Sequence, residues 1–381
     1  MKAKIFQLSL LILMLFQLSA RSQPADDKLF PVKGFCIGLP GPSDVDRFVR
    51  FINDELAPRG VNTLVLLVDY AYQYECYPQL RDSAALSKAD AKKIVTVCRK
   101  NNIRILPQID LLGHQSWAGH LNKLLANFPE FDETPYVKMP ENYVWPNPDG
   151  LYCKSYCPLH PEVHKVIFAL VDELCDAFET DAFHAGMDEV FYLGSDSCPR
   201  CAGVDKAVLF AGEVTLLRNH LAEKNRELWI WGDRLIDGKA TGIGLWEASY
   251  NSTYRAVDMI PKDVVICDWH YERPDQTAVY FAMKGLRVVT CPWRQPKVAV
   301  MQTEDMARWR TYATPEMKPR YYGMLETTWT DPVRFMDGFY GIKSARPRHN
   351  NNEENPAEKG NTPWDTFRAM FDKMKDLEDS K

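Results

Sequence analysis

Residues 183–190 read FHAGMDEV, and this stretch decides how the surrounding chain is interpreted. It opens with apolar residues after a long helical pattern, which predicts a short buried strand that runs out into a loop. Two adjacent carboxylates, Asp188 and Glu189, stand at its carboxyl end, and two like charges are costly to bury together without a cation, a ligand or a proton. Gly186 allows a ligand or another backbone to approach closely. An isolated Asp-Glu pair more often flanks a helix, so the rest of the chain has to decide its meaning.

Apolar runs alternate with helical patterns on both sides of this stretch. Strands are predicted at 32–39, 61–69, 103–109, 183–190, 228–231, 264–269, 287–291 and 321–329, and helices at 44–56, 87–98, 161–178, 204–224, 276–283, 303–312 and 363–377. Ser43 is predicted to cap the first helix. Eight alternating units favour an α/β fold that closes into a (β/α)8 TIM barrel. An open doubly wound sheet is the alternative, although no Gly-x-Gly-x-x-Gly turn follows the first strand.

The predicted organisation is a single catalytic domain with short additions at both ends. The barrel is assigned to residues 23–345, a polar loop to 346–363 and a C-terminal helix that packs on the barrel to 364–381. Residues 1–22 are predicted to be a cleavable signal peptide, because Lys2 and Lys4 precede an apolar run that is too short for a membrane span. We therefore expect a secreted or periplasmic protein with no membrane span.

Charge and cysteine content narrow the class of partner. Removal of residues 1–22 takes away Lys2, Lys4 and Arg21 and no acids, so the formal net charge of −5 becomes −8. A mildly acidic surface argues against nucleic acid as a partner. Four of the ten cysteines, Cys153, Cys157, Cys198 and Cys201, have a spacing that suits either zinc or a pair of disulfides. Export favours the disulfides.

Acids and aromatic rings recur where the predicted strands end. In a barrel of this type these ends meet at one rim, where active sites lie. The residues at this rim are Asp69, Asp110, His114, Asp188, Glu189, Trp231, Trp269, Tyr271, Trp293, Trp329 and Asp331. Indoles stack on the apolar faces of sugar rings, and carboxylates accept hydrogen bonds from sugar hydroxyls. The composition of the rim therefore predicts a carbohydrate substrate.

Three motifs carry a resemblance to a known family. The segment HAGMDE at 184–189 resembles the H-x-G-x-D-E signature of glycoside hydrolase family 20, the β-N-acetylhexosaminidases. LPQIDLLGH at 106–114 is similar to the third-strand segment of that family, and Trp329 with Asp331 resembles its eighth-strand Trp-x-Glu. The match runs in order through most of residues 33–335.

The resemblance implies a function and a mechanism. Terminal β-linked N-acetylhexosamine would be removed with retention, without metal or cofactor. Glu189 would be the general acid, and the substrate's own 2-acetamido oxygen would be the nucleophile, oriented by Asp188. Tyr271 is the candidate to hold the acetamido oxygen, and His184 is expected to contact substrate with the residues of the rim.

The sequence also departs from the family. An arginine usually ends the first strand, but residues 34–40 read GFCIGLP, and Trp293 stands near the place of a usual seventh-strand tyrosine. The α/β domain that often precedes the barrel has no room in residues 23–32. Two other functions therefore stay open: a glycan-binding protein with little turnover, and a hydrolase of a modified amino sugar. The oligomeric state and the choice between GlcNAc and GalNAc are not predicted.

Overall fold

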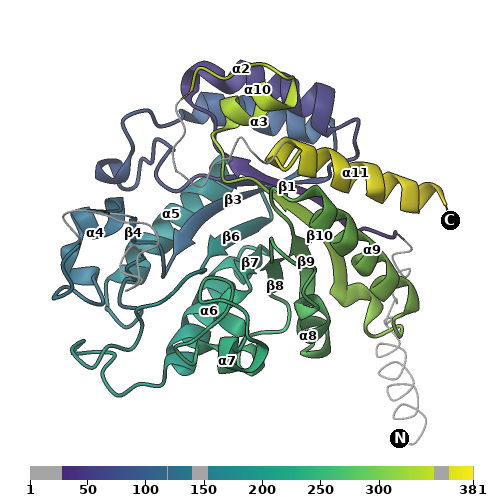
Figure 1. Cartoon of the computed structure of the whole chain (residues 1–381). Helices are drawn as coiled ribbons and strands as arrows, with labels where there is room; N and C mark the ends of the chain where they lie inside the picture. Colours follow the sequence, from purple (N-terminus) through teal and green to yellow (C-terminus); the bar gives the residue numbers. More distant parts are fainter. Residues whose placement is uncertain (1–27, 118, 140–152, 347–359, 381) are drawn as a thin grey trace, which may run out of the picture.

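Eight parallel strands form the closed barrel at the centre of the molecule (Figure 1). The computed structural model describes residues 28–117, 119–139, 153–346 and 360–380. The barrel strands are β1 (Val32–Gly38), β2 (Thr63–Leu67), β3 (Arg104–Leu111), β6 (Ala182–Gly186), β7 (Glu227–Trp231), β8 (Val265–Trp269), β9 (Arg287–Cys291) and β10 (Tyr321–Thr327). Strand β10 closes onto β1 through pairs that begin with Val32 and Gly323. The predicted (β/α)8 barrel is confirmed, and an open sheet is excluded.

Buried side chains form one layer inside the barrel and another between the barrel and its helices. Along β8, Val265, Cys267 and Trp269 belong to the inner layer, whereas Ile266 packs with the outer one. This alternation follows from the two-residue period of a strand. The inner layer combines indoles with small thiols, namely Trp229, Trp231 and Trp269 with Cys36, Cys267 and Cys291. Large and small side chains together fill the barrel, and this packed core forms the support for the loops at its rim.

Helices cover the outside of the barrel (Figure 1). They are α2 (Val45–Phe51), α3 (Lys88–Lys100), α5 (Val163–Ala177), α6 (Lys206–Ala222), α8 (Thr277–Met283), α9 (Pro296–Tyr312) and α10 (Pro332–Phe339), with short α4 (Lys123–Asn127) and α7 (Gly238–Thr241). Ser87 caps α3, because its hydroxyl accepts a hydrogen bond from the backbone N–H of Asp90 at 3.2 Å. The chain after β3 also forms a small hairpin of β4 (Ser116–Trp117) and β5 (His120–Leu121).

Some predicted elements need correction. Ser43 does not cap a helix: its hydroxyl bonds to the Asp44 carboxylate at 3.1 Å, and α2 begins after a 3-10 turn at Pro42–Asp44. The strand predicted to end at Trp329 ends at Thr327, and the helix α10 that follows was not predicted. Its Pro332 occupies a first-turn position, where proline needs no backbone donor.

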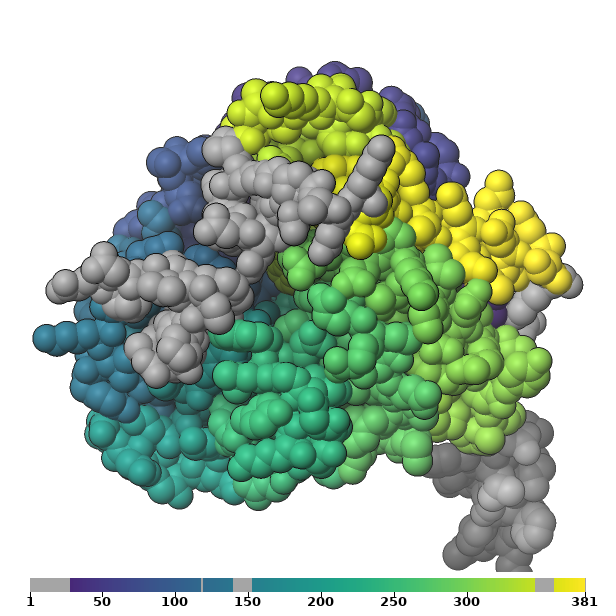
Figure 2. Space-filling view, viewed as in Figure 1, coloured from purple at the N-terminus to yellow at the C-terminus, as the bar shows by residue number. Residues whose placement is uncertain are grey.

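The C-terminal helix α11 (Pro363–Asp379) packs against α9, α10 and β10. In Figure 2 this helix, in yellow, lies along the green surface formed by the later barrel units. The predicted signal peptide and residues 347–359 of the predicted polar loop lie outside the described residues. Within the described part of the chain, no helix is long and apolar enough to cross a membrane.

Candidate active site

A cavity of about 650 Å³ opens at the carboxyl ends of the barrel strands. All the predicted site residues line it except His184 and Trp231: Asp69, Asp110, His114, Asp188, Glu189, Trp269, Tyr271, Trp293, Trp329 and Asp331. Its volume falls in the range of small-molecule sites. The structure therefore brings together residues from the ends of β2, β3, β6, β8, β9 and β10.

Two glycines allow the ends of β3 and β6 to interlock. Gly186 has φ +64°, and a Cβ placed on it would lie 2.0 Å from Oδ1 of Asp110. A Cβ on Gly113 would lie 2.5 Å from the carbonyl oxygen of Asp188. Any larger residue would push the two strand ends apart. These contacts explain why Gly113 stands before His114 in the 106–114 motif and why Gly186 stands before the Asp-Glu pair in the 184–189 motif.

The backbone that presents the paired acids is itself unusual. Met187 and Glu189 have φ values of +67° and +48°, and His114 opposite them has +52°. Such left-handed conformations cost free energy in non-glycine residues and cluster at functional sites. The tight turn directs Asp188 and Glu189 into the same cavity although they are neighbours in sequence.

His114 lies between the two acids. Its Nε2 is 3.2 Å from Oδ2 of Asp188 and 3.3 Å from Oε2 of Glu189. Burial alone would lower the pKa of His114, but the neighbouring Cys153 thiol and the Asp188 carboxyl outweigh it and raise the pKa well above its usual range. A protonated imidazole at this position would offset the charge of the paired acids.

Asp188 keeps one oxygen available. Burial raises the pKa of Asp188, and the opposing attraction of His114 does not cancel that effect. Its Oδ1 is buried and has no hydrogen-bond partner among the residues that the structure describes. A buried carboxylate oxygen normally has a donor. This oxygen is therefore a ready acceptor for an N–H or O–H group of a ligand in the cavity.

Asp233, which the sequence places at the end of the fifth strand without a role, and Arg234, which it did not identify, hold the acid pair in place. Oδ2 of Asp233 accepts hydrogen bonds from the backbone N–H of Glu189 at 2.9 Å and from Nε of Arg234 at 2.5 Å. Its Oδ1 accepts from the Trp269 indole at 3.3 Å. Arg234 is fully buried and donates to three backbone carbonyls, including that of Trp246 at 2.9 Å. These bonds fix the orientation of the loop that carries Glu189.

Asp69 and Asp110 form a second acidic group on the cavity wall. Oδ1 of Asp69 accepts a hydrogen bond from the backbone N–H of Asp110 at 2.9 Å. Burial and the charge of Asp110 raise the pKa of Asp69 to about 7, and burial and the charge of Asp188 raise that of Asp110 to about 7. The wall can therefore both donate and accept hydrogen bonds near neutral pH, as sugar hydroxyls require.

Aromatic side chains form the opposite wall. The Trp329 indole donates a hydrogen bond to the Tyr271 hydroxyl at 2.9 Å, and the Tyr271 ring lies 5.1 Å from Trp269 and 5.2 Å from Trp293. Trp246, which was not predicted, also lines the cavity. It follows β7 in an irregular segment, so no strand pattern marked it. Flat apolar surfaces beside acids suit a sugar ring.

His184 and Trp231 are corrections to the prediction that they contact substrate. Both are fully buried and neither lines the cavity. Nδ1 of His184 accepts a hydrogen bond from the backbone N–H of Gly186 at 3.1 Å, and its ring lies 4.5 Å from that of Trp231. Burial lowers the pKa of His184 to about 3. The neutral imidazole therefore supports the turn from beneath.

The four cysteines near the motif separate into two places. Cys153 contacts the active site, with its thiol 3.6 Å from Oε2 of Glu189 and 3.6 Å from Nδ1 of His114. Cys157, Cys198 and Cys201 group elsewhere, with Glu133. All ten cysteines lie in the described residues and none forms a disulfide. The disulfide prediction for these four is therefore wrong in this structure, because Cys153 lies against His114 and Glu189 and leaves three thiols for the other group.

Comparison with known proteins agrees with this geometry. The chain matches glycosyl hydrolase family 20, catalytic domain, over residues 61–341. A beta-hexosaminidase of Akkermansia muciniphila is 30% identical over 122 residues, covering 30% of this chain and 21% of the relative. A lacto-N-biosidase of Bifidobacterium bifidum is 23% identical over 205 residues, covering 51% and 17%. This chain thus spans only a small part of the length of these curated relatives.

A solved structure shares the fold over most of the chain. The chitobiase of Flavobacterium johnsoniae superposes with a TM-score of 0.57 at 18% identity, covering 91% of this chain and 52% of that chain. At this identity the likeness concerns the barrel alone. The family match itself covers well over half of the 381 residues and contains both interlocked motifs. The chain belongs to glycosyl hydrolase family 20.

Proposed function

We propose that this protein is a glycoside hydrolase that removes terminal β-linked N-acetylhexosamine with retention, through the 2-acetamido group of the substrate. One observation carries the proposal: Asp188 and Glu189 meet in one cavity, and Oδ1 of Asp188 has no partner among the described residues. A site for double displacement needs a carboxylate that attacks the anomeric carbon. A site for substrate assistance needs instead an acceptor for the acetamido N–H beside the general acid.

In the proposed first step Glu189 gives its proton to the glycosidic oxygen as the bond to the anomeric carbon breaks. The acetamido carbonyl oxygen attacks that carbon, and Asp188 accepts the acetamido N–H. The cyclic intermediate is cationic, which favours the ionised form of Asp188 in spite of its burial. Glu189, now a carboxylate, then removes a proton from water, and the water opens the ring with net retention.

The aromatic wall and the second acidic group would hold the rest of the sugar. All four side chains line the cavity. In this proposal Trp329 and Tyr271 would offer a flat surface and a hydroxyl to the acetamido side, and Asp69 and Asp331 would face the outer hydroxyls. Strand β1 supplies no arginine, but Arg294 after β9 lines the cavity with its guanidinium 4.5 Å from the Trp293 ring centre. The cation thus follows β9 and not β1. This different position favours, as a second candidate substrate, an amino sugar with a different substituent or linkage.

The test compares aryl β-glycosides of GlcNAc, GalNAc and glucose, together with a thiazoline analogue of the cyclic intermediate. We expect hydrolysis of the acetamido sugars, an almost inert glucoside and strong inhibition by the thiazoline. NMR of the first sugar released should show the β anomer. A covalent sugar on any carboxylate after treatment with a 2-fluoro glycoside would contradict the mechanism. Binding of GlcNAc with no turnover of any substrate would favour a glycan-binding protein.

We also propose that the protein is exported, to the periplasm or the medium. The support is the sequence of residues 1–22, in which two lysines precede an apolar run and a small-x-small site. N-terminal sequencing of protein recovered outside the cytoplasm should find a chain that begins near residue 23. A cytoplasmic chain that retains residues 1–22 would contradict this proposal.

A further inference from the structure

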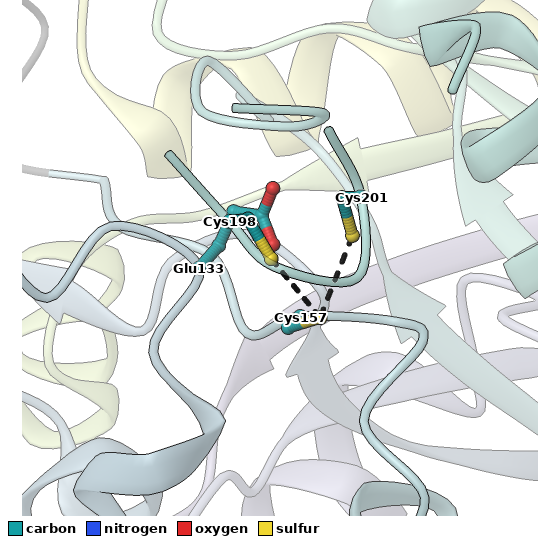
Figure 3. Close-up of side chains that lie close together, drawn as sticks. All are labelled: Glu133, Cys157, Cys198 and Cys201. Atoms are coloured by element: carbon teal, nitrogen blue, oxygen red, sulfur yellow. Dashed lines mark hydrogen bonds between the residues drawn. The ribbon is translucent and has the colours of Figure 1, made fainter. Parts of the chain in front are cut away.

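Three thiols and a carboxylate meet at one buried point away from the cavity. Cys157, Cys198, Cys201 and Glu133 each offer one ligand atom, and these atoms lie within 4.8 Å of one another (Figure 3). All four residues are buried, and none lines the cavity. The chain after β3 supplies Glu133 and Cys157, and the chain after β6 supplies the two cysteines of Cys198-Pro199-Arg200-Cys201.

The sulfur separations suit metal ligands. Sγ of Cys157 is 3.6 Å from Sγ of Cys198 and 3.4 Å from Sγ of Cys201. A disulfide would need about 2.05 Å. Two thiolates that bind one tetrahedral zinc at about 2.3 Å lie about 3.8 Å apart. The two measured separations are thus close to the distance between two ligands of a tetrahedral zinc, and Cys157 is near both Cys198 and Cys201.

Glu133 gives an independent indication. Its side chain is fully buried, and Oε1 accepts a hydrogen bond from the backbone N–H of Ser195 at 2.9 Å. Within residues 28–117, 119–139, 153–346 and 360–380, the thiols of Cys198 and Cys201 are the side-chain donors beside this carboxylate, and Oε2 has no hydrogen-bond partner apart from them. A buried carboxylate oxygen beside three thiols is costly unless a cation binds it. A disulfide would use two of the three thiols and would leave the buried carboxylate beside the third thiol with no cation to offset its charge.

Backbone N–H groups lie near two of the three sulfurs. The backbone N–H groups of Arg200 and Cys201 lie near the Cys198 sulfur and favour its thiolate form, and that of Leu159 does the same for Cys157. N–H donors stabilise thiolates, which are the form that binds metal. Three thiolates and a carboxylate leave a net negative charge on a zinc centre, and these donors would spread that charge into the backbone.

We propose that Glu133, Cys157, Cys198 and Cys201 bind one structural zinc ion. Four protein ligands would fill the tetrahedral positions of the metal and leave none for water or substrate, so its role would be structural. The metal would join the chain after β3, which carries His114 and Cys153, to the chain after β6, which carries Glu189. A hydrogen bond of 2.6 Å between Tyr136 and Ser195 already links the same two segments. The zinc would thereby fix the position of the segment that carries His114 relative to the segment that carries Glu189.

The first experiment is metal analysis of the full chain, purified without metal-affinity resin or reductant. We expect about one zinc per chain, and all ten thiols should react once the protein is denatured with a chelator. Cys157→Ser and Cys198→Ser should lose the zinc, and Glu133→Gln should release it to a chelator faster than the wild type does. Cys76→Ser, at an exposed cysteine, is the matched control and should retain it.

A second measurement does not depend on the folding of any variant. Wild-type protein stripped of metal should bind Co²⁺ with the strong visible absorption of a tetrahedral thiolate site, and Zn²⁺ should displace it and raise the Tm. Two thiols fewer than ten after denaturation, with no metal, would establish a disulfide and overturn the proposal. Ten free thiols with no uptake of Zn²⁺ or Co²⁺ would overturn it equally. Neither readout involves hydrolysis, so the result is independent of the proposed activity.

Discussion

Three side chains around one imidazole set the chemistry of the site. His114 contacts both Asp188 and Glu189, and the Cys153 thiol contacts both His114 and the same Glu189 oxygen. Adjacent acids would ordinarily repel each other in a buried site. Here the imidazole offsets that repulsion, while Asp233 fixes the backbone of Glu189. Each acid can therefore take a different role although the two share one turn.

Glu189→Gln is expected to lose hydrolysis of an unactivated disaccharide by on the order of 10²–10⁴-fold, because the leaving group no longer receives a proton. An aryl glycoside with a good leaving group should be affected less in the first step. Affinity for the product, measured by calorimetry, should stay near that of the wild type, since glutamine keeps the shape of the side chain. Turnover of the disaccharide at the wild-type rate would remove Glu189 from the mechanism.

Asp110→Asn is expected to flatten the dependence of stability on pH. Burial and the charge of Asp188 raise the pKa of Asp110 from 3.8 to about 7, so the folded chain holds a proton that the unfolded chain releases. The contribution of this group to the unfolding free energy is fully present below pH 3.8 and is lost as the pH rises through about 7. The unfolding free energy of the variant minus that of the wild type should therefore be larger at pH 8 than at pH 4, by on the order of 1–3 kcal/mol.

Denaturant unfolding at the two pH values measures this difference. The exposed Asp379→Asn is the control and should follow the wild type at both. Parallel pH profiles for Asp110→Asn and wild type would show that Asp110 titrates at its ordinary pKa.

At the scale of the elements, the strand ends are the parts that position the site. The pairing of β3 with β6 shifts register between Gln108 and Leu111, next to Asp110, and the chain then turns sharply at Gly186. Helix α10 also positions a site residue, because its N-cap residue, Asp331, lines the cavity. Asp331 accepts hydrogen bonds at Oδ1 from the backbone N–H groups of Val333 at 2.9 Å and Arg334 at 3.1 Å.

Asp331 should therefore show separable effects on stability and on binding. Asp331→Ala removes the cap and should cost about 1 kcal/mol of unfolding free energy. Asp331→Asn keeps Oδ1 as a cap and should cost much less, but both variants remove the charge from the cavity and should raise KM. The pair is compared by denaturant unfolding and by steady-state kinetics. Equal loss of stability in the two variants would mean that the cap contributes little.

At the scale of the whole molecule, aromatic packing joins the two ends of the chain. The fully buried Phe367 of α11 lies 5.0 Å from Phe35 of β1 and 6.1 Å from Phe335 of α10, measured between ring centres. The helix therefore covers the seam where β10 closes onto β1. On the opposite side, the proposed zinc would hold the loops after β3 and β6.

Phe367→Ala is expected to destabilise the barrel by about 3–5 kcal/mol, because it removes a buried ring and leaves a cavity at the closing seam. Lys375→Ala, at an exposed position of the same helix, is the control and should change the unfolding free energy little. Thermal unfolding followed by circular dichroism distinguishes them. An unchanged Tm for Phe367→Ala would show that α11 is dispensable for closure of the barrel.

The sequence alone determined the barrel and most of the cavity wall. Alternating buried runs specify parallel strands, and the carboxyl ends of parallel strands must meet at one rim, so Asp69, Asp110, Asp188 and Trp329 could be placed from chain order. Glu189 was found for the same reason, because the Asp-Glu pair lies two residues beyond the end of the buried strand β6.

The tertiary structure decided depth and pairing. His184 and Trp231 belong to the same strand ends, but each lies one layer too deep, since the tilt of a barrel strand sets how far a side chain reaches toward the rim. The separation of Cys153 from Cys157 depends on how two irregular segments fold over each other, and no strand or helix period governs such segments. The interlock of Gly186 with Asp110 likewise joins positions far apart in the chain, where only the closed barrel fixes the distance.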